Sequence, residues 1–354
     1  MTADMSGMTA VFLTDKAKIE LREAPKPVPG QGEVLVRVRA CGICGSDLHF
    51  YHGRLPSRAD ISPGHEFAGD IAELGEGVDG FQEGDRVAVE PYKFCRECSY
   101  CRAGHYLECS ERVAIGALVS LSGSGVDICS GALTEYIVVP SYTLYRLPDE
   151  LDFVLGALME PLAAAVHGVH LAEVSEGETV CVLGSGTIGL MSILAARAAG
   201  ATNVIASYRH AHQAAAALAV GASRVVKSEE IDDLGPEQID VVIETVGGAA
   251  QTPTQALGLI GPRGRVLLLG LFTQPVQLNV QRVMTEQARI IGGNAYCRRP
   301  GQPTDYDAAL TIVRAEADRA GAIITHRFPL DQTAEAFATA ADKSTGSIKV
   351  QVCP

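Results

Sequence analysis

The sequence lacks the features that would direct it to a membrane, a secretory route or nucleic acid. Residues 1–7 contain no basic start followed by an apolar run, so no secretory segment is expected. The most apolar stretch, 179–200, is interrupted by Gly184, Gly186 and Gly189, and therefore does not read as a membrane span. Basic residues are also scarce, with 29 Lys and Arg against 42 Asp and Glu. We expect a cytoplasmic protein that binds neither nucleic acid nor membrane.

The order of local patterns predicts two domains within the 354 residues. The first half contains short β-rich segments such as 34–40 and 85–90, separated by glycine and proline. From about residue 160, apolar strands at 180–183, 204–207, 241–244 and 266–269 alternate with alanine-rich helical patterns at 190–199 and 211–220. After about residue 296 the pattern becomes irregular, and a helix over 333–341 precedes a strand over 347–352. This rhythm predicts a β-rich domain interrupted by an inserted α/β domain with a parallel sheet.

Four of the ten cysteines share one short segment with the spacing C-x2-C-x2-C-x7-C. They are Cys95, Cys98, Cys101 and Cys109. Four thiolates form a closed tetrahedral shell, which is typical of a zinc ion that stabilises a loop. The alternative, a chance cluster of free thiols, does not account for the spacing. Without a secretory segment, reduced cysteines and metal ligands fit better than disulfides.

A second set of metal-binding residue types lies upstream, in Cys44 and the adjacent pair His65-Glu66. It combines a thiol, an imidazole and a carboxylate, and it lacks a fourth protein ligand. A zinc ion held in this way keeps a position open for water or substrate. This set therefore predicts a catalytic zinc.

A glycine-rich loop, Gly-Ser-Gly-Thr-Ile-Gly, directly follows the strand at 180–183 and begins a helix. In that strand–turn–helix context it predicts a dinucleotide site. The predicted contacts are Gly184, Ser185, Gly186, Thr187, Ile188 and Gly189, completed by Val246, Gly270 and Leu271 at later strand ends.

The end of the next strand favours NADP(H) over NAD(H). An NAD site usually has Asp or Glu there for the ribose 2′-hydroxyl. This strand ends instead in Ser207-Tyr208-Arg209-His210, with no acid. A hydroxyl and a guanidinium would bind a 2′-phosphate, whereas a carboxylate would repel it. The alternative is that Arg209 is an ordinary surface residue.

The chain resembles the zinc-dependent medium-chain alcohol dehydrogenase family in five motifs. These are the segment Cys41-Gly-Ile-Cys44-Gly-Ser46-Asp47-Leu-His49, the triplet Gly64-His65-Glu66, the cysteine quartet, Glu160-Pro161-Leu162 and the glycine loop. The resemblance covers nearly the whole chain and is greatest to the sorbitol or polyol dehydrogenase branch. It implies a GroES-like catalytic domain formed by 1–159 and 296–354, and a Rossmann NADP-binding domain formed by 160–295. The implied site lies in the cleft between the two domains, and the implied activity is hydride transfer between a secondary alcohol or ketone and the cofactor.

The resemblance also implies roles for individual residues. Cys44 and His65 would bind the catalytic zinc, and Glu66 would be a third ligand or would exchange with water. Glu160 would reach the zinc through its bound water. Ser46 and His49 would pass a proton from the substrate to solvent, while Asp47 would orient His65.

The sequence departs from the polyol dehydrogenase pattern near the implied substrate pocket. Where that branch has Arg before Tyr, the chain has Asn294-Ala295-Tyr296-Cys297, and Phe50 replaces a tyrosine after His49. The segment 117–130 reads as a mobile loop that reshapes the cleft. With Phe50 and Tyr296 as pocket residues, the expected small-molecule substrate is a less hydroxylated ketone, a cyclic compound or an imine.

Alternatives remain at the level of the reaction. An enzyme similar to threonine or amino-alcohol dehydrogenases would share these motifs, and a non-catalytic nucleotide-binding relative is a more distant interpretation. The family also forms dimers and tetramers through a sheet edge, for which the apolar strand 264–271 is the expected element. We therefore expect a homodimer or homotetramer.

Overall fold

The computed structural model describes residues 7–54, 62–116, 131–234, 238–298 and 300–354, so the segment 117–130 lies outside the described residues. The chain divides into two compact units. The first contains Met1–Glu160, Cys297–Leu310 and Ile324–Pro354, and the second contains Pro161–Tyr296 and Thr311–Ile323. The predicted second segment of the catalytic domain is therefore interrupted, because the contacts of Thr311–Ile323 are with the second unit.

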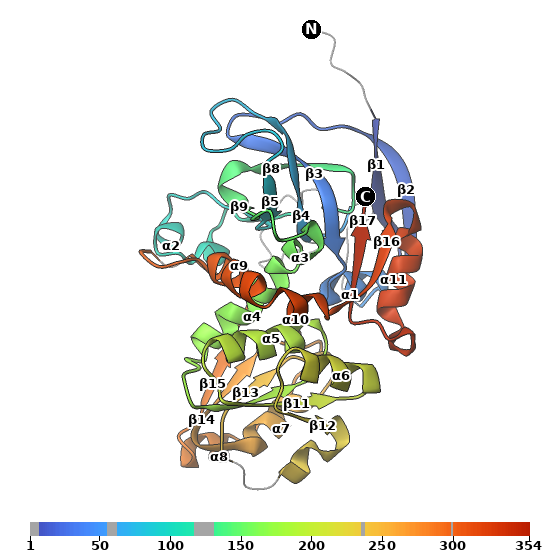
Figure 1. Cartoon of the computed structure of the whole chain (residues 1–354). Helices are drawn as coiled ribbons and strands as arrows, with labels where there is room; N and C mark the ends of the chain where they lie inside the picture. Colours follow the sequence, from blue (N-terminus) through green and yellow to red (C-terminus); the bar gives the residue numbers. More distant parts are fainter. Residues whose placement is uncertain (1–6, 55–61, 117–130, 235–237, 299) are drawn as a thin grey trace. The chain divides into compact units, whose positions relative to one another are not determined.

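The first unit is built on a seven-stranded sheet with the order β16-β17-β3-β4-β5-β9, in which β8 also pairs with β3 (Figure 1). Only β16 and β17 run parallel within it. Its strands are β3 (Glu33–Gly42), β4 (Glu66–Leu74), β5 (Arg86–Val89), β8 (Tyr136–Pro140), β9 (Leu144–Arg146), β16 (Ile324–Pro329) and β17 (Lys349–Cys353).

Apolar residues of these strands form one core, which includes Val34, Val36, Phe67, Ile71 and Val350. The predicted strands at 34–40 and 347–352 correspond to β3 and β17.

Smaller elements complete the first unit. Two hairpin-like pairs are present, β1 (Gly7–Asp15) with β2 (Lys18–Pro25) and β6 (Tyr92–Lys93) with β7 (Val113–Ala114). The helices are α1 (Gly45–Tyr51), α2 (Ser99–Arg102), α3 (Phe153–Gly156) and α11 (Thr333–Ala341), the last over the predicted range. Two further helices, α4 (Met159–Leu171) and α9 (Asp305–Ala315), cross the division between the units.

The second unit is a six-stranded, fully parallel sheet with the order β12-β11-β10-β13-β14-β15. This is the doubly wound Rossmann order, with the reversal between β10 and β13. Its strands are β10 (Thr179–Leu183), β11 (Asn203–Tyr208), β12 (Arg224–Lys227), β13 (Ile239–Glu244), β14 (Ile260–Leu268) and β15 (Arg289–Gly292). The helices are α5 (Thr187–Ala198), α6 (Ala211–Ala219), α7 (Thr252–Leu259), α8 (Val280–Thr285) and α10 (Ala317–Gly321). The predicted fold class, a GroES-like β-rich domain plus a Rossmann domain, is confirmed.

One expectation about this sheet needs correction. The apolar strand expected at the edge, 264–271, largely corresponds to β14, which has β15 on its outer side. The outermost strand is therefore β15, and Ile290 within it is 37% exposed. β15 escaped prediction because it is only four residues long and has few apolar neighbours in sequence.

The stretch Phe153–Leu171 has the length and composition of a membrane-crossing helix. However, 67% of its most apolar window is buried inside the protein, as in the core helix of a globular protein. The interrupted segment 179–200, by contrast, forms β10, the glycine loop and α5, as predicted.

Candidate active site

The ends of two paired strands bring three metal-binding side chains together in the first unit. Potential ligand atoms of Cys44, His65 and Glu66 all lie within 4.8 Å of one another. Cys44 follows β3 and caps the N-terminus of α1, while His65 directly precedes β4 and Glu66 begins it. Because β3 and β4 are antiparallel and Gly42 is paired with Glu66, the end of one strand lies beside the start of the other.

Asp47 contacts both Cys44 and His65. Its side chain is 1% exposed, and its Oδ2 accepts a hydrogen bond of 2.9 Å from the backbone N–H of Cys44. Its Oδ1 faces Nδ1 of His65 at 3.7 Å. With Nδ1 turned towards this carboxylate, Nε2 of His65 is the nitrogen left for a metal, the arrangement that orients zinc-bound imidazoles. At 3.7 Å this is a contact between charges rather than a hydrogen bond, and the orienting role of Asp47 stays a prediction.

The charges around His65 and its burial act on its pKa in opposite directions. Burial alone lowers the pKa of His65, but the charges of Asp47 and Cys44 outweigh it and leave that pKa well above its usual value. Burial raises the pKa of Asp47, and His65 partly offsets the rise. The pocket therefore favours a positive charge at the position of the imidazole, which a metal cation also satisfies.

Glu66 has a partner that the sequence did not suggest. Its Oε2 lies 2.5 Å from Nζ of Lys349, and both side chains are nearly inaccessible, at 1% and 2% exposure. Lys349 also donates a hydrogen bond of 3.1 Å to the carbonyl oxygen of Ile43. A Cβ atom at Gly42 would collide with the Glu66 carboxylate, so the strand position opposite Glu66 requires glycine. Glu66 is therefore fixed in place and already shared with a cation.

The other predicted catalytic residues lie around this group at differing depth. Glu160 lies outside the 4.8 Å set but close enough to contribute to the raised pKa values of His65 and Lys349. Ser46 and His49 are one helical turn apart on α1, and both are partly buried. Burial, followed by the charges of nearby cations, lowers the pKa of His49, so its imidazole is neutral at pH 7 and able to accept a proton.

The predicted pocket residues are both buried. Phe50 is 5% exposed and packs against Leu13 in a small hydrophobic cluster. Phe50 thus lies on the inward side of α1, and its role in the substrate pocket stays a prediction. Tyr296 is 1% exposed and belongs to the second unit.

The cysteine quartet also converges. Sγ of Cys95 lies 3.7 Å from Sγ of Cys101 and 3.5 Å from Sγ of Cys109, and all four residues belong to one compact set. The backbone N–H groups of Glu97 and Cys98 lower the pKa of Cys95 to about 7. Zinc–sulfur bonds of about 2.3 Å place the sulfurs of a tetrahedral site roughly 3.8 Å apart, so the observed spacing fits this metal.

The mixed set fits zinc as well. Thiolate, imidazole and carboxylate are all zinc ligands, and three protein donors leave a fourth position open.

The glycine loop of the second unit has the strained conformation that its sequence requires. Gly184 follows β10 with φ of +97°, and a Cβ atom at Gly189 would collide with the carbonyl oxygen of Gly184. Gly186 is the N-cap of α5, and Ser185, Thr187 and Ile188 complete the turn. The helix N-terminus is thus presented to a ligand without side chains in the way.

Ser207 supports this loop rather than facing freely outward. It is 3% exposed, its Oγ accepts a hydrogen bond of 2.9 Å from the N–H of Gly184, and its carbonyl oxygen accepts one of 2.7 Å from Oγ of Ser185. The hydroxyl proton of Ser207 remains available to a ligand. The last residue of β11 is Tyr208, so Tyr208 rather than Ser207 occupies the strand end where an acid was expected in NAD sites.

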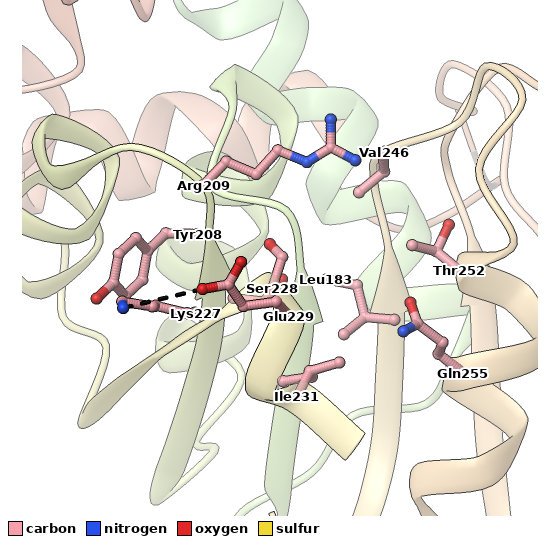
Figure 2. A pocket seen from close by; sticks show the side chains of 11 residues that line it. Leu183, Tyr208, Arg209, Lys227, Ser228, Glu229, Ile231, Val246, Thr252 and Gln255 are labelled. Carbon is pink, nitrogen blue, oxygen red and sulfur yellow. Dashed lines mark ion pairs between the residues drawn. The ribbon is translucent and has the colours of Figure 1, made fainter. Parts of the chain in front are cut away.

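A cavity of about 620 Å³ lies beside this loop, entirely within the second unit (Figure 2). Its size suits a small organic ligand or one half of a dinucleotide. It is lined by Leu183, Ser207, Tyr208, Arg209, Lys227, Ser228, Glu229, Ile231, Val246, Thr252 and Gln255.

The remaining predicted cofactor residues lie at strand ends of the same sheet. Val246 and Leu271 are exposed, at 38% and 43%, just beyond β13 and β14. Gly270 packs against the buried carboxylate of Glu244, which accepts hydrogen bonds from the N–H groups of Val246 and Gly247. These positions are at the carboxyl edge of the sheet, where ligands of this fold bind.

Two cations of these sites were missed from the sequence. Lys349 lies 283 residues from Glu66, and nothing in its alternating strand marks it as buried. Lys227 ends β12, whose four residues Arg-Val-Val-Lys are too short and too charged to stand out. The regular alternation of strands and helices, which leads one to expect a strand after α6, was the signal that could have revealed β12.

Comparison with known proteins agrees with this architecture. The chain matches the alcohol dehydrogenase GroES-like domain over residues 30–149 and the zinc-binding dehydrogenase family over residues 187–314. It is 33% identical over 344 residues to a sorbitol dehydrogenase from Halalkalibacterium halodurans, covering 94% of this chain and 95% of the relative. It is also 33% identical to an L-threonine 3-dehydrogenase from Pyrococcus horikoshii, covering 93% and 94% of the two chains.

Among solved structures, it resembles a protein from Sinorhizobium meliloti assigned as a zinc-binding dehydrogenase and bound to NADP. The TM-score is 0.86 at 33% identity, over 99% of this chain and 100% of the other. Matches of this extent in both sequence and fold show common descent over the catalytic and nucleotide-binding parts alike. The chain belongs to the zinc-dependent medium-chain alcohol dehydrogenase family, on its polyol dehydrogenase-like branch.

Proposed function

We propose that this alcohol dehydrogenase-type oxidoreductase transfers hydride between NADP(H) and a secondary alcohol or its ketone. The observation that carries the proposal is the convergence of Cys44, His65 and Glu66 within 4.8 Å, in a chain that also has a Rossmann sheet. When bound, zinc would polarise the substrate oxygen and the nicotinamide would accept or return the hydride.

The chain's own residues supply positioning and proton transfer. Cys44 and His65 would hold the metal, and Asp47, whose Oδ1 lies 3.7 Å from Nδ1 of His65, would orient the imidazole. Ser46 and His49, one turn apart on α1, would carry the proton of the substrate hydroxyl away. A second zinc would be held by the cysteine quartet, giving two zinc ions per chain.

The preference for NADP(H) is supported by the charges at the end of β11. Within the part of the chain that the structure describes, no acid stands at this strand end, and the guanidinium of Arg209 forms no ion pair with a described residue. An arginine at this cavity that has no ion-pair partner among the described residues suits the 2′-phosphate.

The test is steady-state kinetics with NADPH and NADH. Wild-type protein should have the higher kcat/KM with NADPH, and Arg209→Ala should weaken NADPH about ten- to a hundredfold while leaving NADH nearly unchanged. Because Ser207 is buried against Gly184, Tyr208→Asp is the sharper variant for moving the preference towards NADH. Equal or better kcat/KM of the wild type with NADH would refute the proposal.

The names of the relatives suggest the class of substrate. Relatives act on polyols and on threonine by name, so a polyol- or cyclitol-like alcohol, a ketone or an imine is the first candidate, and an amino alcohol such as threonine is the second. A panel of ketones, polyols, cyclic imines and L-threonine, followed at the NADPH absorbance, separates these classes. Highest kcat/KM with L-threonine would select the second candidate.

We also propose that the chain forms a homodimer or homotetramer. The outer strand β15 has no neighbour on one side among the described strands, and Ile290 within it and Met284 of α8 are exposed, at 37% and 71%. A free strand edge with apolar side chains needs a cover. Light scattering at micromolar concentration that returns the mass of one chain would refute this.

A further inference from the structure

The end of β12 contributes a cation to the cofactor cavity. β11 and β12 are parallel neighbours, and their register pairs Tyr208 with Lys227, so both strands end at the same edge of the sheet. Both residues line the cavity of about 620 Å³. Lys227 is therefore next to the position where an NAD site has its ribose-binding acid.

The ammonium group of Lys227 is only loosely paired. Its Nζ lies 3.9 Å from Oε1 of Glu229 and 3.8 Å from Oε1 of Glu230, and its side chain is 53% exposed. These separations exceed hydrogen-bond length, so the donors of Lys227 are not used by either carboxylate. A phosphate group with two negative charges, placed within hydrogen-bond distance of Nζ, would bind Lys227 more favourably than these distant, solvated carboxylates do.

The two cations of the cavity occupy different sides of it. Figure 2 shows the Arg209 guanidinium turned towards Val246, whereas Lys227 points towards Glu229. Arg209 therefore approaches the cavity from the side of Val246. Lys227 is placed beside the end of β11 itself, where the ribose hydroxyls of a bound adenosine lie in this fold.

We propose that Lys227 is a second cation, besides Arg209, that binds the 2′-phosphate of the cofactor from the β12 side, and that Glu229 is the counter-charge that it exchanges for the phosphate. The inference rests on the proposed NADP(H) preference and adds two residues to it. Glu229 lines the cavity whereas Glu230 does not, although both lie at a similar distance from Lys227. Glu229 should therefore repel a 2′-phosphate and limit its affinity, and Glu230 should not.

The alternative is that Lys227 is a solvated surface lysine within an acidic turn. The two glutamates distinguish the interpretations, because they form a matched pair. Both are removed by the same Glu→Gln change, both are exposed, and they differ in whether they face the cavity.

The experiment is isothermal titration calorimetry on the zinc-loaded protein with adenosine 2′,5′-bisphosphate and with 5′-AMP, which differ only in the 2′-phosphate. Lys227→Met keeps the aliphatic stem and should weaken the bisphosphate about tenfold, with less than about a twofold change for 5′-AMP. Glu229→Gln should strengthen the bisphosphate by about threefold, and Glu230→Gln should leave it unchanged within about 1.5-fold.

The outcomes separate this inference from the proposed function. If the wild type prefers the bisphosphate, Arg209→Ala removes that preference and Lys227→Met keeps it, the cofactor proposal stands and the role of Lys227 is refuted. If Glu229→Gln and Glu230→Gln have equal effects, the counter-charge role of Glu229 is refuted. If the wild type binds both ligands equally, the NADP(H) preference fails, and this inference fails with it.

Discussion

The buried pair between Glu66 and Lys349 makes Lys349→Met the most informative single substitution in the first unit. Both side chains are almost completely inaccessible, and Nζ lies 2.5 Å from Oε2. Removing the ammonium group leaves the carboxylate buried without its cation, and also removes the donor to the Ile43 carbonyl oxygen. Breaking a buried ion pair in this way costs about 3–5 kcal/mol of unfolding free energy, a large share of the roughly 5–15 kcal/mol that holds a domain folded.

The loss should be partly reversed by neutralising the partner. In Lys349→Met/Glu66→Gln no charge is left buried, so the double variant should be more stable than the sum of the two single effects by about 2–3 kcal/mol. The control is the exposed variant Lys18→Met, which breaks only a surface contact with Glu20. We expect no measurable change in its free energy of unfolding.

Urea unfolding followed by circular dichroism at pH 7 measures these differences. Zinc content must be determined in the same samples, so that loss of metal is not taken for loss of the ion pair. A Lys349→Met variant no less stable than Lys18→Met would show that the pair contributes nothing, and additive single effects would show that the two residues do not interact.

Three further predictions concern the metals, the proton path and acid stability. Cys98→Ser should lower stability or cause aggregation, whereas Cys44→Ser should abolish turnover with an unchanged circular dichroism spectrum; retained activity in the latter would overturn the assignment of the catalytic ligand. His49→Ala should slow turnover by about 10²–10⁴-fold. Burial lowers the pKa of His49, so the pH–rate limb that it causes should lie below pH 6.5 and disappear in the variant. Burial opposes the ionisation of Asp70, but its two arginine partners outweigh burial and lower the pKa of Asp70 below 3.8. The stabilisation that the ionised Asp70 gives should therefore be complete above pH 4 and lost as the pH falls further. Asp70→Asn should be less stable than the wild type by about 1 kcal/mol at pH 7 and equally stable in strong acid, as urea unfolding at each pH would measure.

The parts of the site that were predictable from sequence depend on local spacing. The quartet from Cys95 to Cys109 is confined to fifteen positions, so its ligands are close whatever the fold around them. The glycine loop is similar, because Gly184 and Gly189 must approach each other within a single turn. The doubly wound sheet followed from the alternation of apolar strands and alanine-rich helices, which needs no knowledge of distant contacts.

The parts that could not be predicted depend on contacts between distant segments or on the rotation of one helix. Lys349 reads as a solvent-facing strand residue until β17 is known to pair with β3, which carries it beside Glu66. Phe50 follows His49 by one residue, and the turn of about 100° per helical residue directs it to Leu13, a contact that the sequence does not show. A pattern shows the period of an element but not its rotation about its axis.

The division of the chain has a consequence for how the two ligand sites respond to mutation. Every predicted zinc ligand belongs to the first unit, and every residue that lines the cofactor cavity belongs to the second. Cys44 and Lys227 therefore lie in different units, and we expect a change at one site to leave the other unaffected. Cys44→Ser should lower the zinc content by one ion per chain and leave the affinity for adenosine 2′,5′-bisphosphate unchanged. Lys227→Met should lower that affinity and leave the zinc content unchanged. A loss of nucleotide affinity in Cys44→Ser would show that the catalytic metal also organises the nucleotide-binding unit, and that the two sites are not built independently.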